Sequence, residues 1–175
     1  MQIYEGSARQ DYEEVLRSIG AFLDQCAMRE IAITETADGF LVQGLAPQVE
    51  EGRPWNDPAV RLQKRSFQIV EDDVNRFMDE VVARRNAGRP PQSAIPDPFY
   101  EHALRVLGHY IDEQKPRDVL LFEQDRSFVV RLLMATRTGP RHVLAEFTRE
   151  EVEGLVSGAS RLRNRPGASI LSASA

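Results

Sequence analysis

The sequence predicts an α+β protein in which an α-β-β-β-α unit occurs twice, and the two copies build one antiparallel sheet of about six strands with helices packed on it. Two observations lead to this prediction. The segment YEEVLRSIGAFLDQ, which begins at Tyr12, is matched by YEHALRVLGHYIDEQ, which begins at Tyr100. Both segments are followed by short runs rich in β-branched and aromatic residues, which is typical of strands. A duplication of this kind predicts an approximate two-fold axis between the copies.

The match extends from the first helix into the first two strands without a gap. The identical pairs are Tyr12/Tyr100, Glu13/Glu101, Leu16/Leu104, Arg17/Arg105, Gly20/Gly108, Asp24/Asp112, Arg29/Arg117, Glu35/Glu123, Phe40/Phe128 and Val42/Val130. The register then changes, because residues 71–86 align with 149–164. The first copy therefore holds extra residues, which we assign to an inserted loop at 45–63.

The repeat also predicts the domain boundaries. The first repeat covers residues 1–88, a linker covers 89–98, and the second repeat covers 99–165. The last residues, 166–175, are rich in small side chains and are expected to form a flexible tail. Because three strands alone are marginally stable, we expect the two repeats to form one domain.

The first element of each copy is predicted to be a helix, over residues 9–26 and 97–114. Apolar residues recur there with spacings of three and four, which indicates an amphipathic helix. Gly20 and Gly108 lie inside these helices, where glycine is less favourable than alanine by about 1 kcal/mol. We interpret the two glycines as points of close contact between helix and sheet.

Strands and a final helix follow in each copy. EIAITE and FLVQGL flank Asp38-Gly39, which is a hairpin turn signal, and DVLLFE and SFVVRLLMA flank a tighter turn. A third strand is expected near 65–70 and again near 141–147. The last helix of each copy starts with acidic residues, which are favourable at a helix N-terminus.

Composition argues against several classes of function. The net charge is −5, from 27 acidic and 22 basic residues, which argues against a nucleic-acid partner. The single cysteine, Cys26, allows neither an intramolecular disulfide nor a cysteine-based zinc site. No apolar run approaches the roughly 20 residues of a membrane span. We expect a cytoplasmic protein with no membrane partner.

Catalytic signatures are missing from the sequence. HExxH, GxSxG, GxGxxG and the Walker A motif do not occur. We therefore expect no cofactor, no metal and no catalytic residue, and we favour a function other than catalysis.

Glu35 and Glu123 are candidate binding residues, because each carboxylate ends an apolar strand face at matching positions. If the hairpins meet at the two-fold axis, the two carboxylates could share a pocket with Arg17 and Arg105. Paired carboxylates can perform acid–base chemistry when their surroundings separate their pKa values. The alternative interpretation is that these strand ends are solvated.

Trp55, Phe122 and Arg131 are candidate contact residues of another kind. Trp55 is the only tryptophan and lies in the inserted loop, where it either contacts a partner or covers a sheet edge. Leu120, Phe122, Val129 and Leu133 make the strands of the second copy apolar on both faces. Such a sheet must be covered twice, by the inserted loop, by a second copy of the chain or by a partner protein.

Three functions remain open at this point. The favoured one is a non-catalytic protein-binding module of the adaptor or chaperone-like kind, which binds another protein or itself as a homodimer. The second is a small-molecule binder or small enzyme that uses Glu35, Glu123, Arg17 and Arg105 in a pocket between the repeats. The third is a nucleic-acid binder that uses sheet arginines such as Arg131, which the acidic composition disfavours.

Overall fold

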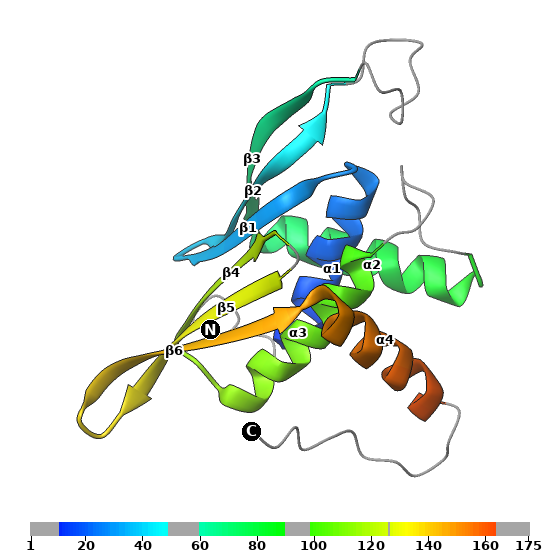
Figure 1. Ribbon diagram of the computed structural model, residues 1–175. Coiled ribbons are helices and arrows are strands. Elements are labelled where there is room, and N and C mark those ends of the chain that lie inside the picture. Colours follow the sequence, from blue (N-terminus) through cyan, green and yellow to red (C-terminus); the bar gives the residue numbers. More distant parts are fainter. Residues whose placement is uncertain (1–10, 49–59, 90–98, 126, 164–175) are drawn as a thin grey trace.

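The computed structural model describes residues 11–48, 60–89, 99–125 and 127–163 (Figure 1). The first half of the chain contains one helix, three strands and a second helix. These are α1 (Tyr12–Gln25), β1 (Arg29–Thr36), β2 (Gly39–Pro47), β3 (Leu62–Val70) and α2 (Glu71–Asn86). The second half has the same order. It contains α3 (Tyr100–Gln114), β4 (Asp118–Gln124), β5 (Ser127–Thr136), β6 (Gly139–Thr148) and α4 (Arg149–Arg163). The predicted α+β class is confirmed.

The strands form one six-stranded antiparallel sheet in the order β3-β2-β1-β4-β5-β6. The two halves join at its centre, where β1 pairs with β4 and Ile33 lies opposite Leu121. Figure 1 shows the helices on one side of the sheet, with α1 and α3 central and α2 and α4 outside them. The opposite side is here called the helix-free face.

Alternation along the strands decides which side chains enter the core. Successive side chains in a strand point to opposite faces, so Ile31 and Ile33 of β1 and Phe40 and Val42 of β2 all point toward the helices, where they are buried. Val119, Leu121, Phe128 and Val130 do the same in the second half. The apolar stripes of α1 and α3 cover these residues, and the result is one continuous core.

Both bounds of the inserted loop differ from the prediction. The inserted loop was expected to start at residue 45 and end at 63. Residues 45–47 instead belong to β2 and 62–63 to β3, because pairing continues through Leu45–Lys64, Ala46–Gln63 and Pro47–Leu62. The Asp38-Gly39 turn is confirmed, since Thr36 of β1 pairs directly with Gly39 of β2.

Within the described ranges, none of the helices has both the length and the apolar character that a transmembrane span requires.

Candidate functional site

The two central helices, α1 and α3, contact each other more closely than ordinary side chains allow. A Cβ atom on Gly20 would lie 2.3 Å from the backbone oxygen of Tyr100, and one on Gly108 would lie 2.4 Å from that of Tyr12. The prediction of a close helix–sheet contact at these glycines was therefore wrong. The close contact is between two helices, and each glycine admits the first turn of the opposite helix.

Each of these helices also supplies a carboxylate to the start of the other. Asp24 near the end of α1 accepts hydrogen bonds from the backbone N–H groups of Phe99, Tyr100 and Glu101, at 3.2, 3.1 and 2.9 Å. Asp112 near the end of α3 accepts from Tyr12 and Glu13, both at 2.9 Å. The first N–H groups of a helix have no partner within it, so the two aspartates satisfy them. Burial raises the pKa of both carboxyls, although the hydrogen bonds act in the opposite direction.

Arg17, one of the predicted binding residues, is enclosed in a buried ion-pair network. Its Nε and Nη2 atoms donate to Oε1 of Glu101 at 3.3 and 3.2 Å. Arg84 of α2 donates to the other oxygen of Glu101 at 2.6 Å. Arg17 is 4% exposed and Glu101 1%. Both oxygens of the carboxylate are engaged and little solvent reaches them, so this network joins three helices through Arg17, Glu101 and Arg84.

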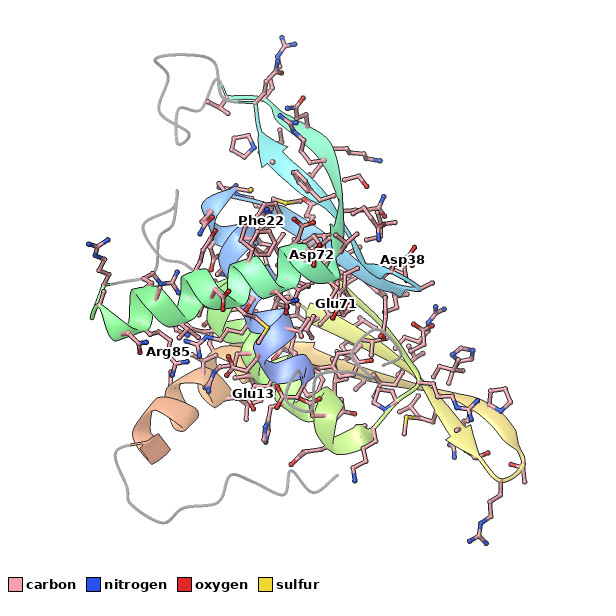
Figure 2. The ribbon with its side chains drawn as sticks, turned by 180° about the vertical axis from the view of Figure 1, so that it is seen from behind. Glu13, Phe22, Asp38, Glu71, Asp72 and Arg85 are labelled. Atoms are coloured by element: carbon pink, nitrogen blue, oxygen red, sulfur yellow. The ribbon has the colours of Figure 1, made fainter. Side chains whose placement is uncertain are left out.

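Arg105, the matching residue in the second half, has a more open surrounding. It donates to Oε1 of Glu13 at 3.3 Å, and Nδ1 of His109 lies 3.0 Å from the other carboxylate oxygen. The side chain of Glu13 is 26% exposed and that of His109 43%. Figure 2 shows Glu13 at the lower end of α1, away from α2. The two predicted arginines therefore bind different glutamates, Glu101 at the start of α3 and Glu13 at the start of α1, in two separate ion-pair clusters.

Glu35 and Glu123 each bind a tyrosine of their own half. The hydroxyl of Tyr12 donates to Glu35 and the hydroxyl of Tyr100 donates to Glu123, both at 2.6 Å. Burial raises the pKa of the Glu35 carboxyl, with the Tyr12 hydrogen bond opposing it. Burial also raises the pKa of both tyrosines, and the glutamates add to this rise.

The register of the central strands keeps these two glutamates apart. Because Ile33 lies opposite Leu121 in an antiparallel pair, Glu35 and Glu123 are displaced from that point in opposite directions. Four residues at about 3.3 Å each separate them by roughly 13 Å along the strands. They therefore form two separate tyrosine–glutamate pairs, and the structure does not bring them together as one acid–base site.

Phe122, another predicted contact residue, lies on the helix-free face in a group of apolar side chains. The members of this group that are half-buried are Ala32, Leu41, Leu120, Phe122, Val129 and Leu133, and Leu144 on the edge strand β6 is 68% exposed. The residues on both sides of the group are polar and exposed, with Lys64 and Ser66 on β3 and His142 and Glu146 on β6. No element in the described part of the chain packs on this group (Figure 1).

Arg131 is an exposed charge within this apolar group. It pairs across the sheet with Leu120 on β4 and with Leu144 on β6. Its guanidinium forms no ion pair with any residue that the structure describes. An arginine among apolar side chains with a polar rim is a composition that protein interfaces favour.

A groove of about 300 Å³ lies elsewhere, between α1 and α2. Phe22 of α1 and Phe77 of α2 are stacked in its lining, with ring centres 5.1 Å apart, and Figure 2 shows Phe22 beside α2. Glu80 and Arg84 contribute polar atoms to the lining. Neither Glu35 nor Glu123 lines this groove.

Some functional candidates were missed, and one lies outside the described residues. Trp55 falls in the range 49–59, so the prediction about it stays a prediction. Sequence reasoning did not identify Glu101 as the centre of the buried network, although Glu13/Glu101 is one of the identical pairs and Glu101, Leu104 and Gly108 share one face of α3. It also missed Leu144, because an exposed leucine on an edge strand has no periodic signal that distinguishes it.

The sequence matches no protein-family description, and neither a curated protein nor a solved structure resembles the chain closely enough to inform its function.

Proposed function

We propose that this protein is a non-catalytic protein-binding module of the adaptor or chaperone-like kind, and that it binds its partner through the helix-free face. The observation that carries the proposal is the apolar group around Phe122, which has a polar rim and no cover within the described chain. Exposed apolar patches of this kind mark interaction sites in proteins that are otherwise well packed. The other candidate clusters support the proposal indirectly, because their charges are already paired inside the molecule.

A duplicated origin of the fold is part of this proposal. The supporting contacts exchange partners between the halves: Arg17 pairs with Glu101, and Arg105 pairs with Glu13. The β1–β4 register is likewise centred on Ile33 and its aligned residue Leu121. An approximate two-fold axis through that point accounts for both sets of contacts. We also place the protein in the cytoplasm, where a chain with a single cysteine needs no disulfide.

Site-specific photo-crosslinking tests the proposed function. A photoreactive amino acid is placed at Phe122 or Leu144 on the helix-free face, and at Val82 on α2 as a control. Val82 is 47% exposed, so the control is accessible, but it lies on the helix side. After irradiation in the cells that express the protein, we expect protein adducts from positions 122 and 144 and few from 82. Equal adducts from all three positions, or none from 122 and 144, would overturn the proposal.

A second candidate function is small-molecule binding in the groove between α1 and α2. The specific observation is the stacked Phe22–Phe77 pair beside Glu80, which provides apolar contact and a polar group in one place. The volume of about 300 Å³ is at the lower end of ligand pockets. Native mass spectrometry of the purified protein would detect a retained compound as excess mass that is lost on denaturation. A native mass that equals a whole number of chains would count against this function.

A further inference from the structure

We propose that the partner of the helix-free face is a second copy of this chain, bound face to face with a two-fold axis that runs across the strands. This inference rests on the proposed function, since it names the occupant of the same face. Three features of the face support it: its size, its charges, and the rows of side chains that lie side by side across the strands.

The size of the face fits a stable dimer. The sheet has six strands. At a spacing of about 4.8 Å, and with roughly eight residues of about 3.3 Å each per strand, the face covers roughly 750 Å². A standard protein interface buries about 800 Å² on each partner. One sheet face therefore offers enough area for a stable dimer. Two sheets commonly pack face to face at a distance of about 10 Å.

The face also has charges of both signs, so two identical faces can meet with opposite charges opposed. Its described cations include Lys64 and Arg131, and its described anions include Glu146. Arg131 pairs in register with Leu144, and Glu146 pairs with Val129, so the two charges occupy neighbouring rows of adjacent strands. No ion pair links them within the described chain. A partner of a single charge sign would satisfy one of these residues and oppose the other.

A two-fold axis at the level of Ile33 and Leu121 makes the two rows complementary. The first row contains Leu41, Thr34, Leu120, Arg131 and Leu144, and the second contains Gln43, Ala32, Phe122, Val129 and Glu146. Rotation about an axis perpendicular to the strands places the first row of one copy over the second row of the other. Leu120 then faces Phe122 of the second copy, and Arg131 lies beside Glu146 of the second copy. The central contacts are apolar, and the pairing of Arg131 with Glu146 of the other copy occurs twice in the dimer.

The test is sedimentation equilibrium of the full chain over a range of concentrations. We expect a dimer for the wild type and a monomer for Phe122→Glu. Arg131→Glu and Glu146→Arg should each weaken association by about tenfold or more, because each brings like charges together twice. The double variant Arg131→Glu/Glu146→Arg should restore association. Arg85→Glu, at an exposed position near the end of α2 (Figure 2), makes the same change in net charge as Arg131→Glu and should leave association unchanged.

Each contrary outcome overturns the inference. A wild-type monomer at all concentrations excludes the dimer, and a dimer that tolerates Phe122→Glu must use another surface. A double variant as weak as the single variants contradicts the proposed arrangement of rows. Circular dichroism of every variant shows whether the fold is retained, and Leu144→Ser replaces Phe122→Glu if the latter unfolds. The crosslinking experiment separates the two proposals: adducts of position 122 with a different protein leave the proposed function standing while the dimer fails.

Discussion

The two ends of the α1–α3 contact are built from the same residues but differ in their exposure to solvent. At one end Glu101 is bound between Arg17 and Arg84 and is almost completely buried. At the other end Glu13, the residue that aligns with Glu101, binds Arg105 and His109 and is 26% exposed. The difference arises because α2 places Arg84 against the first end. Aligned identical residues in the two halves therefore have different surroundings, and we expect them to contribute differently to stability.

The largest expected effect comes from removal of Glu101, and Glu13 is its comparison at the other end. Glu101→Ala leaves two guanidinium groups without their carboxylate in a buried place, and we expect a loss of about 3–5 kcal/mol in the free energy of unfolding. Glu13→Ala removes a partly solvated pair and should cost about 0–1 kcal/mol. Urea denaturation of both variants measures the difference. Similar losses at the two ends would show that burial at Glu101 does not govern its contribution.

The two glycines, unlike the two glutamates, should show equal losses in the free energy of unfolding at both ends of the α1–α3 contact. A methyl group at Gly20 or Gly108 would overlap backbone atoms of the opposite helix at 2.3 or 2.4 Å. Backbone cannot rotate away as a side chain can, so the helices must separate, and we expect each Ala variant to lose about 1–3 kcal/mol.

Gly154→Ala is the matched control for the glycine variants. Gly154 lies in α4, with nothing near its Cβ position, and alanine there should stabilise the helix by up to about 1 kcal/mol. Thermal unfolding followed by circular dichroism compares the three variants. A stabilised Gly20→Ala protein would contradict the close contact between the helices.

The sequence predicted the order of the elements well, because that order depends on local periodicity. The three- and four-residue spacing in α1 and α3 and the Asp38-Gly39 turn each report on a few neighbouring residues. The roles of the identical residues were harder to predict, because their contacts cross between the halves. Asp24 accepts hydrogen bonds from the backbone of residues 99–101, about 75 positions away in the chain. The residue spacing within a single helix or strand cannot predict a contact between such distant positions.

The candidate site was predicted only in part for the same reason. An apolar second face for β4 and β5 follows from alternation at Leu120, Phe122, Val129 and Leu133, and the structure places them on the helix-free face. A shared pocket for Glu35 and Glu123 was inferred without the strand register. The register centred on Ile33 and Leu121 separates them and gives each glutamate a tyrosine instead.

The tyrosine–glutamate pairs extend the comparison to the sheet. Here we again expect equal losses of stability in the two halves. Both hydroxyls donate to their carboxylates at 2.6 Å. Tyr12→Phe and Tyr100→Phe each remove the hydroxyl donor of a half-buried carboxylate, and we expect losses of about 1–2 kcal/mol in the free energy of unfolding. Tyr110→Phe is the control, because the Tyr110 ring packs on Phe147 and no hydrogen bond of its hydroxyl is found among the described residues. Losses that differ strongly between Tyr12 and Tyr100 in urea denaturation would contradict this equality.

The smallest expected effect is the pH dependence of stability that the two capping aspartates cause. Burial raises the pKa of Asp24 and Asp112 above the unfolded value of 3.8. The folded protein therefore binds protons more tightly than the unfolded chain, and the free energy of unfolding should fall as pH rises from about 4 through the raised pKa. Asp24→Asn and Asp112→Asn each remove one such group, so the wild type should lose stability relative to either variant over this interval. Urea titrations at several pH values between about 4 and 7 measure the two differences. If the wild type instead gains stability relative to both variants as pH rises, the hydrogen bonds from the opposite helix outweigh burial, and the aspartates act as charged caps of the two helices.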